Sequence, residues 1–155
     1  MAGQIEKRLK ELNIVLPQAP APAANYVPWT VSGKIVFVAG QLPMAEGALR
    51  YAGKVGRDLD IEQGKAAARL VALNLIAQVK AAAGGDLDRV ARCIKLGAFV
   101  QCPDGFADQP QVVNGASDLM VEIFGDAGKH ARFAVGVNAL PRNAAVEIDA
   151  IFELR

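Results

Sequence analysis

The chain has 155 residues with 17 basic and 16 acidic side chains, which leaves a formal net charge of +1. That length suits one domain built on one core, so we take residues 1–155 as a single domain. Near-neutral charge without clusters of like sign excludes a polybasic membrane anchor and a nucleic-acid-binding stripe. No apolar run is long enough to span a bilayer, and residues 1–12 lack the apolar core of a signal peptide. We therefore expect a cytoplasmic protein that binds neither membranes nor nucleic acids.

Reactive side chains are few: one histidine, His130, two cysteines, Cys93 and Cys102, and two serines, Ser32 and Ser117. A zinc site of the usual kind takes three or four His or Cys ligands, and a hydroxyl nucleophile takes a partnering base. We expect no metal site. Both cysteines should be free, because nine residues along one strand separate them too far for a disulfide. An enzyme built from this chain would work through Arg, Asp, Glu, main-chain groups and water.

The first third of the chain predicts a helix, an extended arm and three strands. Apolar residues at positions 5, 9 and 12 recur with helical spacing, so we expect an N-terminal helical segment over residues 1–16. Its helix should end near Asn13. Four prolines then favour an extended arm over residues 17–28. Three β-type runs separated by glycine turns indicate an antiparallel meander, at 29–31, 35–39 and 48–51.

The middle of the chain predicts two helices with a strand between them. Asp60 is placed to cap the first helix with Gln63 as its capping-box partner, and the helical period continues to Gly84. Residues 90–101 then form a strand. Pro110 opens the second helix, which should cover the same face of the sheet as the first.

The C-terminal segment predicts a β-hairpin formed by residues 132–138 and 145–154. Alternation in its last strand places Glu147 and Asp149 on one face. A turn centred on residues 141–142 would put Arg132 on that face as well, about 13 Å from Glu147 along the ladder. This is too far for one small ligand, so a compact site that uses both would draw them from different chains. The element order βββαβαββ gives an α+β domain with two helices packed on one face of a mixed sheet.

Three separated motifs carry a resemblance to a known family. They are Asn-Tyr-Val at 25–27 through Val-Ala-Gly-Gln-Leu-Pro at 38–43, Val-Val-Asn at 112–114, and Ala-Arg-Phe-Ala-Val-Gly-Val at 131–137 with Leu-Pro at 140–141 and Val-Glu-Ile-Asp-Ala at 146–150. In this order they closely resemble the RidA/YjgF family of reactive imine deaminases. The resemblance extends from about residue 17 to the C-terminus and indicates a longer branch of that family.

The resemblance implies a chorismate-mutase-like α+β fold, a homotrimer with clefts between subunits, and no cofactor. It also implies hydrolysis of 2-imino acids, such as 2-iminopropanoate and 2-iminobutanoate, to 2-oxo acids and ammonia. Arg132 matches the arginine that binds the substrate carboxylate, and Glu147 matches the acid that orients water. A guanidinium suits that task because it grips a carboxylate through two parallel hydrogen bonds. Four further positions match the substrate-binding pocket: Tyr26, Gly40, Asn114 and the main chain of Ala134.

The sequence departs from the family pattern at two positions and leaves other interpretations open. Ala39 replaces a serine of the pocket, and Phe133 replaces a smaller residue. Asn114 could instead be a capping residue, Tyr26 a packing residue, and His130 a loop residue without a role in the site. The alternative function is a trimer that binds small carboxylates without turnover. The family's older endoribonuclease label has little support, because the chain offers no basic patch and no pair of histidines.

Overall fold

The computed structural model of the chain describes residues 3–22 and 24–155. Each expected helix is present, and the strand expected at 90–101 has those bounds. The elements in chain order are α1 (Gln4–Glu11), β1 (Trp29–Ser32), β2 (Ile35–Gln41), β3 (Met44–Ala45), β4 (Ala48–Leu49), α2 (Ile61–Ala82), η1 (Leu87–Arg89), β5 (Val90–Gln101), α3 (Gln109–Phe124), η2 (Gly125–Gly128), β6 (Ala131–Val137), η3 (Pro141–Asn143) and β7 (Val146–Leu154).

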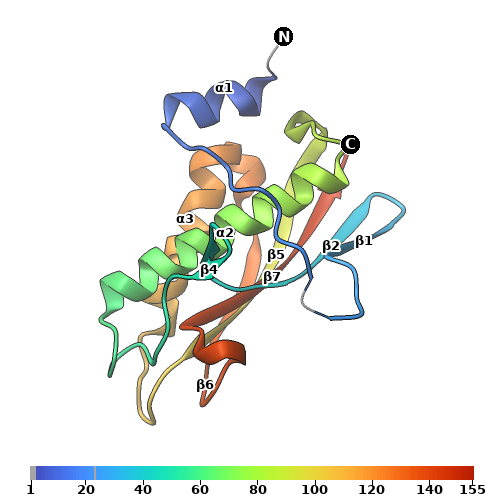
Figure 1. Cartoon of the computed structure of the whole chain (residues 1–155). Coiled ribbons are helices and arrows are strands. Elements are labelled where there is room, and N and C mark those ends of the chain that lie inside the picture. Colours follow the sequence, from blue (N-terminus) through green and yellow to red (C-terminus); the bar gives the residue numbers. More distant parts are fainter. Residues whose placement is uncertain (1–2, 23) are drawn as a thin grey trace.

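Five strands form one mixed sheet in the order β1-β2-β7-β5-β6. The β5–β6 pair is parallel, whereas β1–β2, β2–β7 and β5–β7 are antiparallel. Helices α2 and α3 lie side by side against one face of this sheet (Figure 1), which we call the covered face. The arrangement is the expected α+β fold, with two helices on one face of a mixed sheet.

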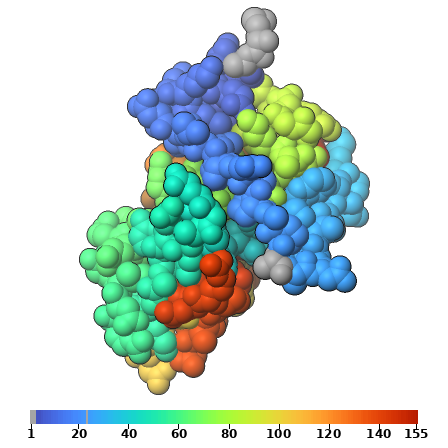
Figure 2. All heavy atoms as spheres, viewed as in Figure 1, coloured from blue at the N-terminus to red at the C-terminus, as the bar shows by residue number. Residues whose placement is uncertain are grey.

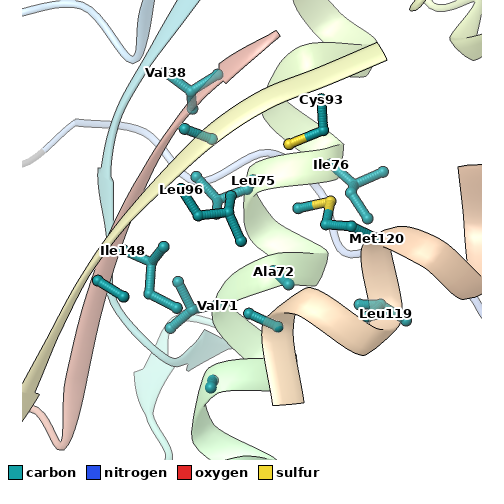
Figure 3. Close-up of a cluster of buried hydrophobic side chains, with 14 of the residues drawn as sticks. Val38, Val71, Ala72, Leu75, Ile76, Cys93, Leu96, Leu119, Met120 and Ile148 are labelled. Carbon is teal, nitrogen blue, oxygen red and sulfur yellow. The ribbon is translucent and has the colours of Figure 1, made fainter. Parts of the chain in front are cut away.

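The core lies between the covered face and the two helices. Strand β7 alternates as expected, because Val146, Ile148, Ala150 and Phe152 are buried while Glu147 points to the other side. Figure 3 shows the side chains that fill this layer, with α2 and α3 each contributing an apolar stripe. The labelled residues are Val38, Val71, Ala72, Leu75, Ile76, Cys93, Leu96, Leu119, Met120 and Ile148.

Local sequence signals explain where both long helices begin and how closely they pack. The expected capping box at the start of α2 is confirmed, since the Asp60 carboxylate accepts from the Gln63 N–H and the Gln63 side chain accepts from the Asp60 N–H. Helix α3 ends at Gly125, whose φ of +62° favours glycine. A Cβ at Gly115 would overlap the Lys65 carbonyl oxygen, so glycine allows α3 to approach the α2 backbone.

The predicted C-terminal hairpin is wrong. Strand β6 pairs with β5 in parallel, and β7 lies between β2 and β5, so β6 and β7 are not neighbours. The reason is the βαβ connection: β5, α3 and β6 form a crossover unit that returns the chain beside β5. The third strand of the expected meander also differs, because β4 pairs with β3 in a separate two-stranded sheet.

The opposite side of the five-stranded sheet, which we call the open face, bears no described helix (Figure 1). It nevertheless carries large apolar side chains, with Phe37 46%, Phe133 36% and Val135 43% exposed. Phe133 lies over Gly97 and packs edge-on against Phe99, with ring centroids 5.3 Å apart. An exposed apolar sheet face of this kind is typical of an interaction surface.

The N-terminal segment is fastened to the body of the molecule. Leu9 of α1 is buried, and the Asp88 carboxylate accepts from the first two N–H groups of this helix. The arm then crosses the molecule between α1 and the β1–β2 hairpin (Figure 2), where the buried Gln78 side chain donates to the Pro20 carbonyl at 2.7 Å. Among the described residues, we find no helix with the length and apolar character needed to cross a membrane.

Candidate functional site

Arg132 lies on the covered face of β6, in register with the buried Leu96 of β5. Its guanidinium is held against α3 by two hydrogen bonds. Nη1 donates to the Ser117 Oγ at 3.0 Å, and Nη2 donates to the Pro110 carbonyl at 3.2 Å. A guanidinium has five N–H donors, so this anchorage leaves donors free for a ligand. The two hydrogen bonds therefore fix the position of a guanidinium that still has the capacity to bind an anion.

The Ser117 hydroxyl links Arg132 to His130. The His130 Nε2 lies 2.8 Å from the Ser117 Oγ, and its Nδ1 lies 2.6 Å from the Gly128 carbonyl. A carbonyl only accepts, so Nδ1 donates to the Gly128 carbonyl, and in the corresponding tautomer of the neutral ring the Ser117 hydroxyl donates to Nε2. His130 is a loop residue, as expected, but it also supports the candidate site. The sequence carried no signal for this contact, because thirteen residues separate it from Ser117.

Two other predicted residues, Asn114 and Ala134, belong to the same region. Asn114 follows Pro110 by four positions and precedes Ser117 by three, so it shares their face of α3. It does not cap the helix, because Asp108 occupies the N-cap position. Ala134 follows Arg132 on the covered face of β6, and β6 is an edge strand with half of its main-chain groups directed away from β5. Arg132, Asn114 and Ala134 thus lie in one region, which we treat as the first half of the candidate site.

Glu147 lies on the open face of β7, opposite Phe99 of β5. Its carboxyl group is half-buried beside Gly40, where a Cβ would lie 3.2 Å from the Glu147 Cδ. Gly40 falls at an irregularity in the β2–β7 ladder, and its lack of a side chain leaves room for the Glu147 carboxyl group. Burial, and secondarily the charge of Asp149, raises the pKa of Glu147 above its ordinary value. A pKa shifted in this direction makes the carboxyl group a stronger proton acceptor when it is ionised.

The prediction that Arg132 and Glu147 share a face is wrong. Arg132 is in register with Leu96 and Ala150, which are buried on the covered face, whereas Glu147 projects from the open face. The error follows from the false hairpin register, since a shift of one residue moves a side chain to the other face. Within one chain the sheet itself separates the two groups.

Tyr26 and Gly40, also predicted from the sequence, line a cavity of about 140 Å³. Tyr26 is half exposed rather than a core packing residue. The remaining walls come from the N-terminal arm, the segment after β2 and the connection between β6 and β7: Pro20, Ala21, Pro22, Pro28, Gln41, Leu42, Met44 and Arg142. Because Gly40 also lies beside the Glu147 side chain, we treat Tyr26, Gly40 and Glu147 as the second half of the candidate site.

Thiol and metal chemistry receive no support from the side chains in the described part of the chain. Cys93 and Cys102 are both buried and unpaired, and burial raises the pKa of the Cys93 thiol to about 12. A thiol with that pKa carries no appreciable thiolate at neutral pH. No cluster of three or more His, Cys, Asp or Glu side chains occurs among residues 3–22 and 24–155.

Comparisons with known proteins agree with this fold. A family model described as "YjgF/chorismate mutase-like, putative endoribonuclease" matches residues 6–154. Protein TCP17 of Trypanosoma cruzi is 47% identical over 154 residues, which cover 99% of this chain and 96% of that protein. The crystal structure of Atu1372 from Agrobacterium tumefaciens is 52% identical, with a TM-score of 0.91 over 97% of this chain and 92% of that one.

A structure that carries the RidA name is similar over most of its length. RidA from the Antarctic bacterium Psychrobacter sp. is 28% identical, with a TM-score of 0.62 over 88% of this chain and 94% of that one. The family model covers nearly the whole sequence, and the motifs around Gly40, Asn114 and Arg132 lie on the elements that form the two half-sites. The chain therefore belongs to the YjgF/RidA family.

Proposed function

We propose that this protein hydrolyses reactive 2-imino acids to 2-oxo acids and ammonia, at sites formed between copies of the chain in a homotrimer. The observation that carries the proposal is that two complementary sets of groups lie on opposite faces of one sheet. One half offers an anchored arginine with free donors, and the other offers a half-buried glutamic acid with a raised pKa. Neither half is complete alone, so a substrate that needs both must lie between two copies.

The reaction needs a group that binds the substrate carboxylate and a group that transfers protons. Arg132 binds the substrate carboxylate through two charge-assisted hydrogen bonds, which fixes the imine carbon in place. Glu147 accepts a proton from a water molecule as its oxygen attacks the carbon of the neutral imine, and passes that proton to the imine nitrogen to give a carbinolamine. Glu147 then accepts the proton of the carbinolamine hydroxyl and gives it back to the substrate at the nitrogen, so that the C–N bond breaks, the C=O bond of the 2-oxo acid forms and ammonia leaves. The raised pKa of Glu147 favours this return of the proton.

The open face supports the assembly. Phe37, Phe133 and Val135 are exposed there in the single chain, and a second copy would remove them from water. Glu147 projects from the same face, so an interface there would also close the site around its carboxyl group. Light scattering at micromolar concentration should give a mass three times that of the 16.3 kDa chain. A monomer would contradict the proposed site.

The activity can be measured by competition. An amino-acid oxidase generates the imine, semicarbazide traps it, and an active deaminase lowers the semicarbazone yield by consuming the imine first. Purified wild-type protein should lower the rate of semicarbazone formation in proportion to its concentration. No effect at stoichiometric concentration would contradict catalysis.

One observation favours a second candidate function, the binding of small carboxylates without turnover. Ala39 occupies a position where the resemblance implies a serine, so one hydroxyl is missing next to Gly40. A protein of this kind would show ligand-dependent thermal shifts with 2-oxo acids that Arg132→Ala abolishes, and no effect on the semicarbazide assay. RNA cleavage finds no support in a net charge of +1 and a single histidine.

A further inference from the structure

The cavity beside Tyr26 and Gly40 is built from three segments that are remote in sequence, and buried amide side chains brace each of them. The described residues include four buried polar side chains, Gln41, Asn74, Gln78 and Gln101. Burying an amide is costly, and among the described residues the Asn74 Oδ1 has no hydrogen-bond partner, so such groups are retained where their remaining hydrogen bonds fix a local geometry. All four act on the walls of this cavity.

Helix α2 supplies two of these braces. The Asn74 Nδ2 donates to the carbonyls of Leu42 and Met44 at 3.1 and 3.0 Å, and so holds the wall that follows β2. One turn along the helix, the Gln78 Nε2 donates to the Pro20 carbonyl of the arm. Gln41, itself a lining residue, donates back to the Ala39 carbonyl at 2.9 Å. The walls are therefore pre-organised before any ligand arrives.

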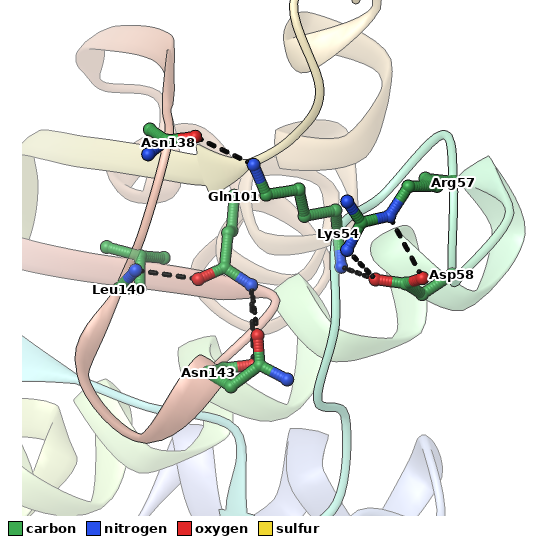
Figure 4. Close-up of polar contacts among 7 residues, drawn as sticks. All are labelled: Lys54, Arg57, Asp58, Gln101, Asn138, Leu140 and Asn143. Atoms are coloured by element: carbon green, nitrogen blue, oxygen red, sulfur yellow. Dashed lines mark hydrogen bonds and ion pairs between the residues drawn. The ribbon is translucent and has the colours of Figure 1, made fainter.

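Gln101 braces the third wall, the connection between β6 and β7 (Figure 4). This side chain is 2% exposed, and both ends of its amide are used: Oε1 accepts from the Leu140 N–H at 2.7 Å, and Nε2 donates to the Asn143 Oδ1 at 2.8 Å. Between these contacts, Arg142 and Asn143 both have left-handed backbone angles, with φ of +59° and +60°. Each such residue is strained by about 1 kcal/mol or more, and strain of this kind persists where the surroundings enforce it.

The enforced turn directs Arg142 to the rim of the cavity. Its hydrogen-bond contact at 3.3 Å is to the Met44 thioether sulfur, which is a weak acceptor without charge. Among the described residues, no carboxylate lies within 4 Å of this guanidinium, although several other arginines of the chain are ion-paired. Small-ligand pockets typically have mostly apolar walls and a few polar groups that fix the orientation of the ligand. Arg142, which forms no ion pair with the described residues and lies on a rigid turn beside this cavity, fits that pattern.

We infer that Arg142 binds a second acidic group of the substrate, so that the protein prefers 2-imino acids whose side chain ends in a carboxylate. This inference rests on the proposed function, in which Arg132 of one copy binds the first carboxylate. The apolar walls contact the methylene groups of the ligand, and Arg142 contacts its distal carboxylate. The cavity is thereby a specificity pocket for dicarboxylic substrates and their 2-oxo acid products.

Binding and turnover together test this inference with a pair of ligands matched in carbon number. Isothermal calorimetry on the assembled wild-type protein compares 2-oxoglutarate with 2-oxopentanoate, which lacks only the distal carboxylate. We expect 2-oxoglutarate to bind at least about tenfold more tightly, because the distal carboxylate adds one charge-assisted hydrogen-bonded pair. Arg142→Gln, at an exposed position, should remove the preference, and Arg142→Lys should retain part of it. Arg57→Gln is the control, because Arg57 is also exposed and lies outside the cavity.

The outcomes separate this inference from the proposed function. Equal affinity of the wild type for both ligands, or a preference that survives Arg142→Gln, would overturn the inference even if imine hydrolysis is observed. A preference for 2-oxoglutarate that Arg142→Gln removes would support it even if the semicarbazide assay shows no turnover, and the protein would then bind dicarboxylates without catalysis.

Discussion

Replacing Arg132 by alanine should abolish the proposed activity while leaving the fold nearly intact. The side chain makes two hydrogen bonds within its own chain, to the Ser117 hydroxyl and the Pro110 carbonyl. Both acceptors keep other partners in the variant, since Ser117 still bonds to His130 and the Pro110 carbonyl is exposed to water. Each lost bond should therefore cost about 1 kcal/mol, below the value for a fully desolvated bond to a charged group. The free energy of unfolding should therefore fall by about 2 kcal/mol or less.

The effect on catalysis should be much larger. Two charge-assisted hydrogen bonds to the substrate carboxylate contribute about 1.5 to 3 kcal/mol each, or roughly 3 to 6 kcal/mol together. Converted to rate, this loss lowers kcat/KM by about 10² to 10⁴. Arg132→Lys keeps the charge but not the planar pair of donors, so we expect a loss of about 10- to 100-fold.

The semicarbazide assay measures these ratios, and thermal unfolding by circular dichroism measures stability in the same samples. Arg57→Ala is the matched control, because it removes an exposed arginine that pairs with Asp58 outside both half-sites. Activity within threefold of the wild type in a folded Arg132→Ala variant would refute the role of this residue. A variant that is inactive because it is unfolded would be detected by its melting curve.

Further predictions concern Glu147 and the contact between the helices. The folded-state pKa of Glu147 is raised, so the native state loses stability as pH rises from the ordinary glutamate range, about 4.3, through that raised value. Glu147→Gln should therefore raise the melting temperature at pH 7 but not at pH 4; a gain independent of pH would contradict this cause. Gly115→Ala places a Cβ against the Lys65 carbonyl and should cost about 1 to 3 kcal/mol, seen as a melting temperature several degrees lower. An unchanged melting temperature would show that α2 and α3 separate without cost.

The sequence predicted those parts of the fold that depend on local signals. The Asp60 capping box set the start of α2, Pro110 marked the first turn of α3, and alternation in β7 identified its buried side. Each signal acts over a few residues, so it can be interpreted without knowledge of the partners.

Strand neighbours could not be assigned in the same way. The short connection between β6 and β7 suggested a hairpin, but the chain turns across the end of β5, where the Gln101 N–H donates to the Ala145 carbonyl. The β5–α3–β6 unit was the better guide, because a helix between two strands usually returns the second strand parallel to the first.

The residues of the candidate site were proposed from the family motifs, and the motifs did not predict how those residues are arranged. The motifs identified Arg132 and Glu147, yet the hairpin register placed them on one face, whereas the structure places them on two. The contacts that support Arg132 could not be predicted from the sequence, because Ser117 and His130 come close to it only when α3 packs on β6. Arg142 likewise acquires its place from the buried Gln101.

The central claim is that one site needs Arg132 from one copy and Glu147 from another, and subunit mixing tests it most directly. Arg132→Ala and Glu147→Gln proteins, each inactive alone, are unfolded together in equal amounts and refolded into trimers. Every mixed trimer with cyclic symmetry then contains one interface with both native residues, so random assembly should restore about one quarter of the wild-type activity. Activity that stays at the level of the separate variants, in trimers shown by mass spectrometry to be mixed, would contradict a site shared between chains.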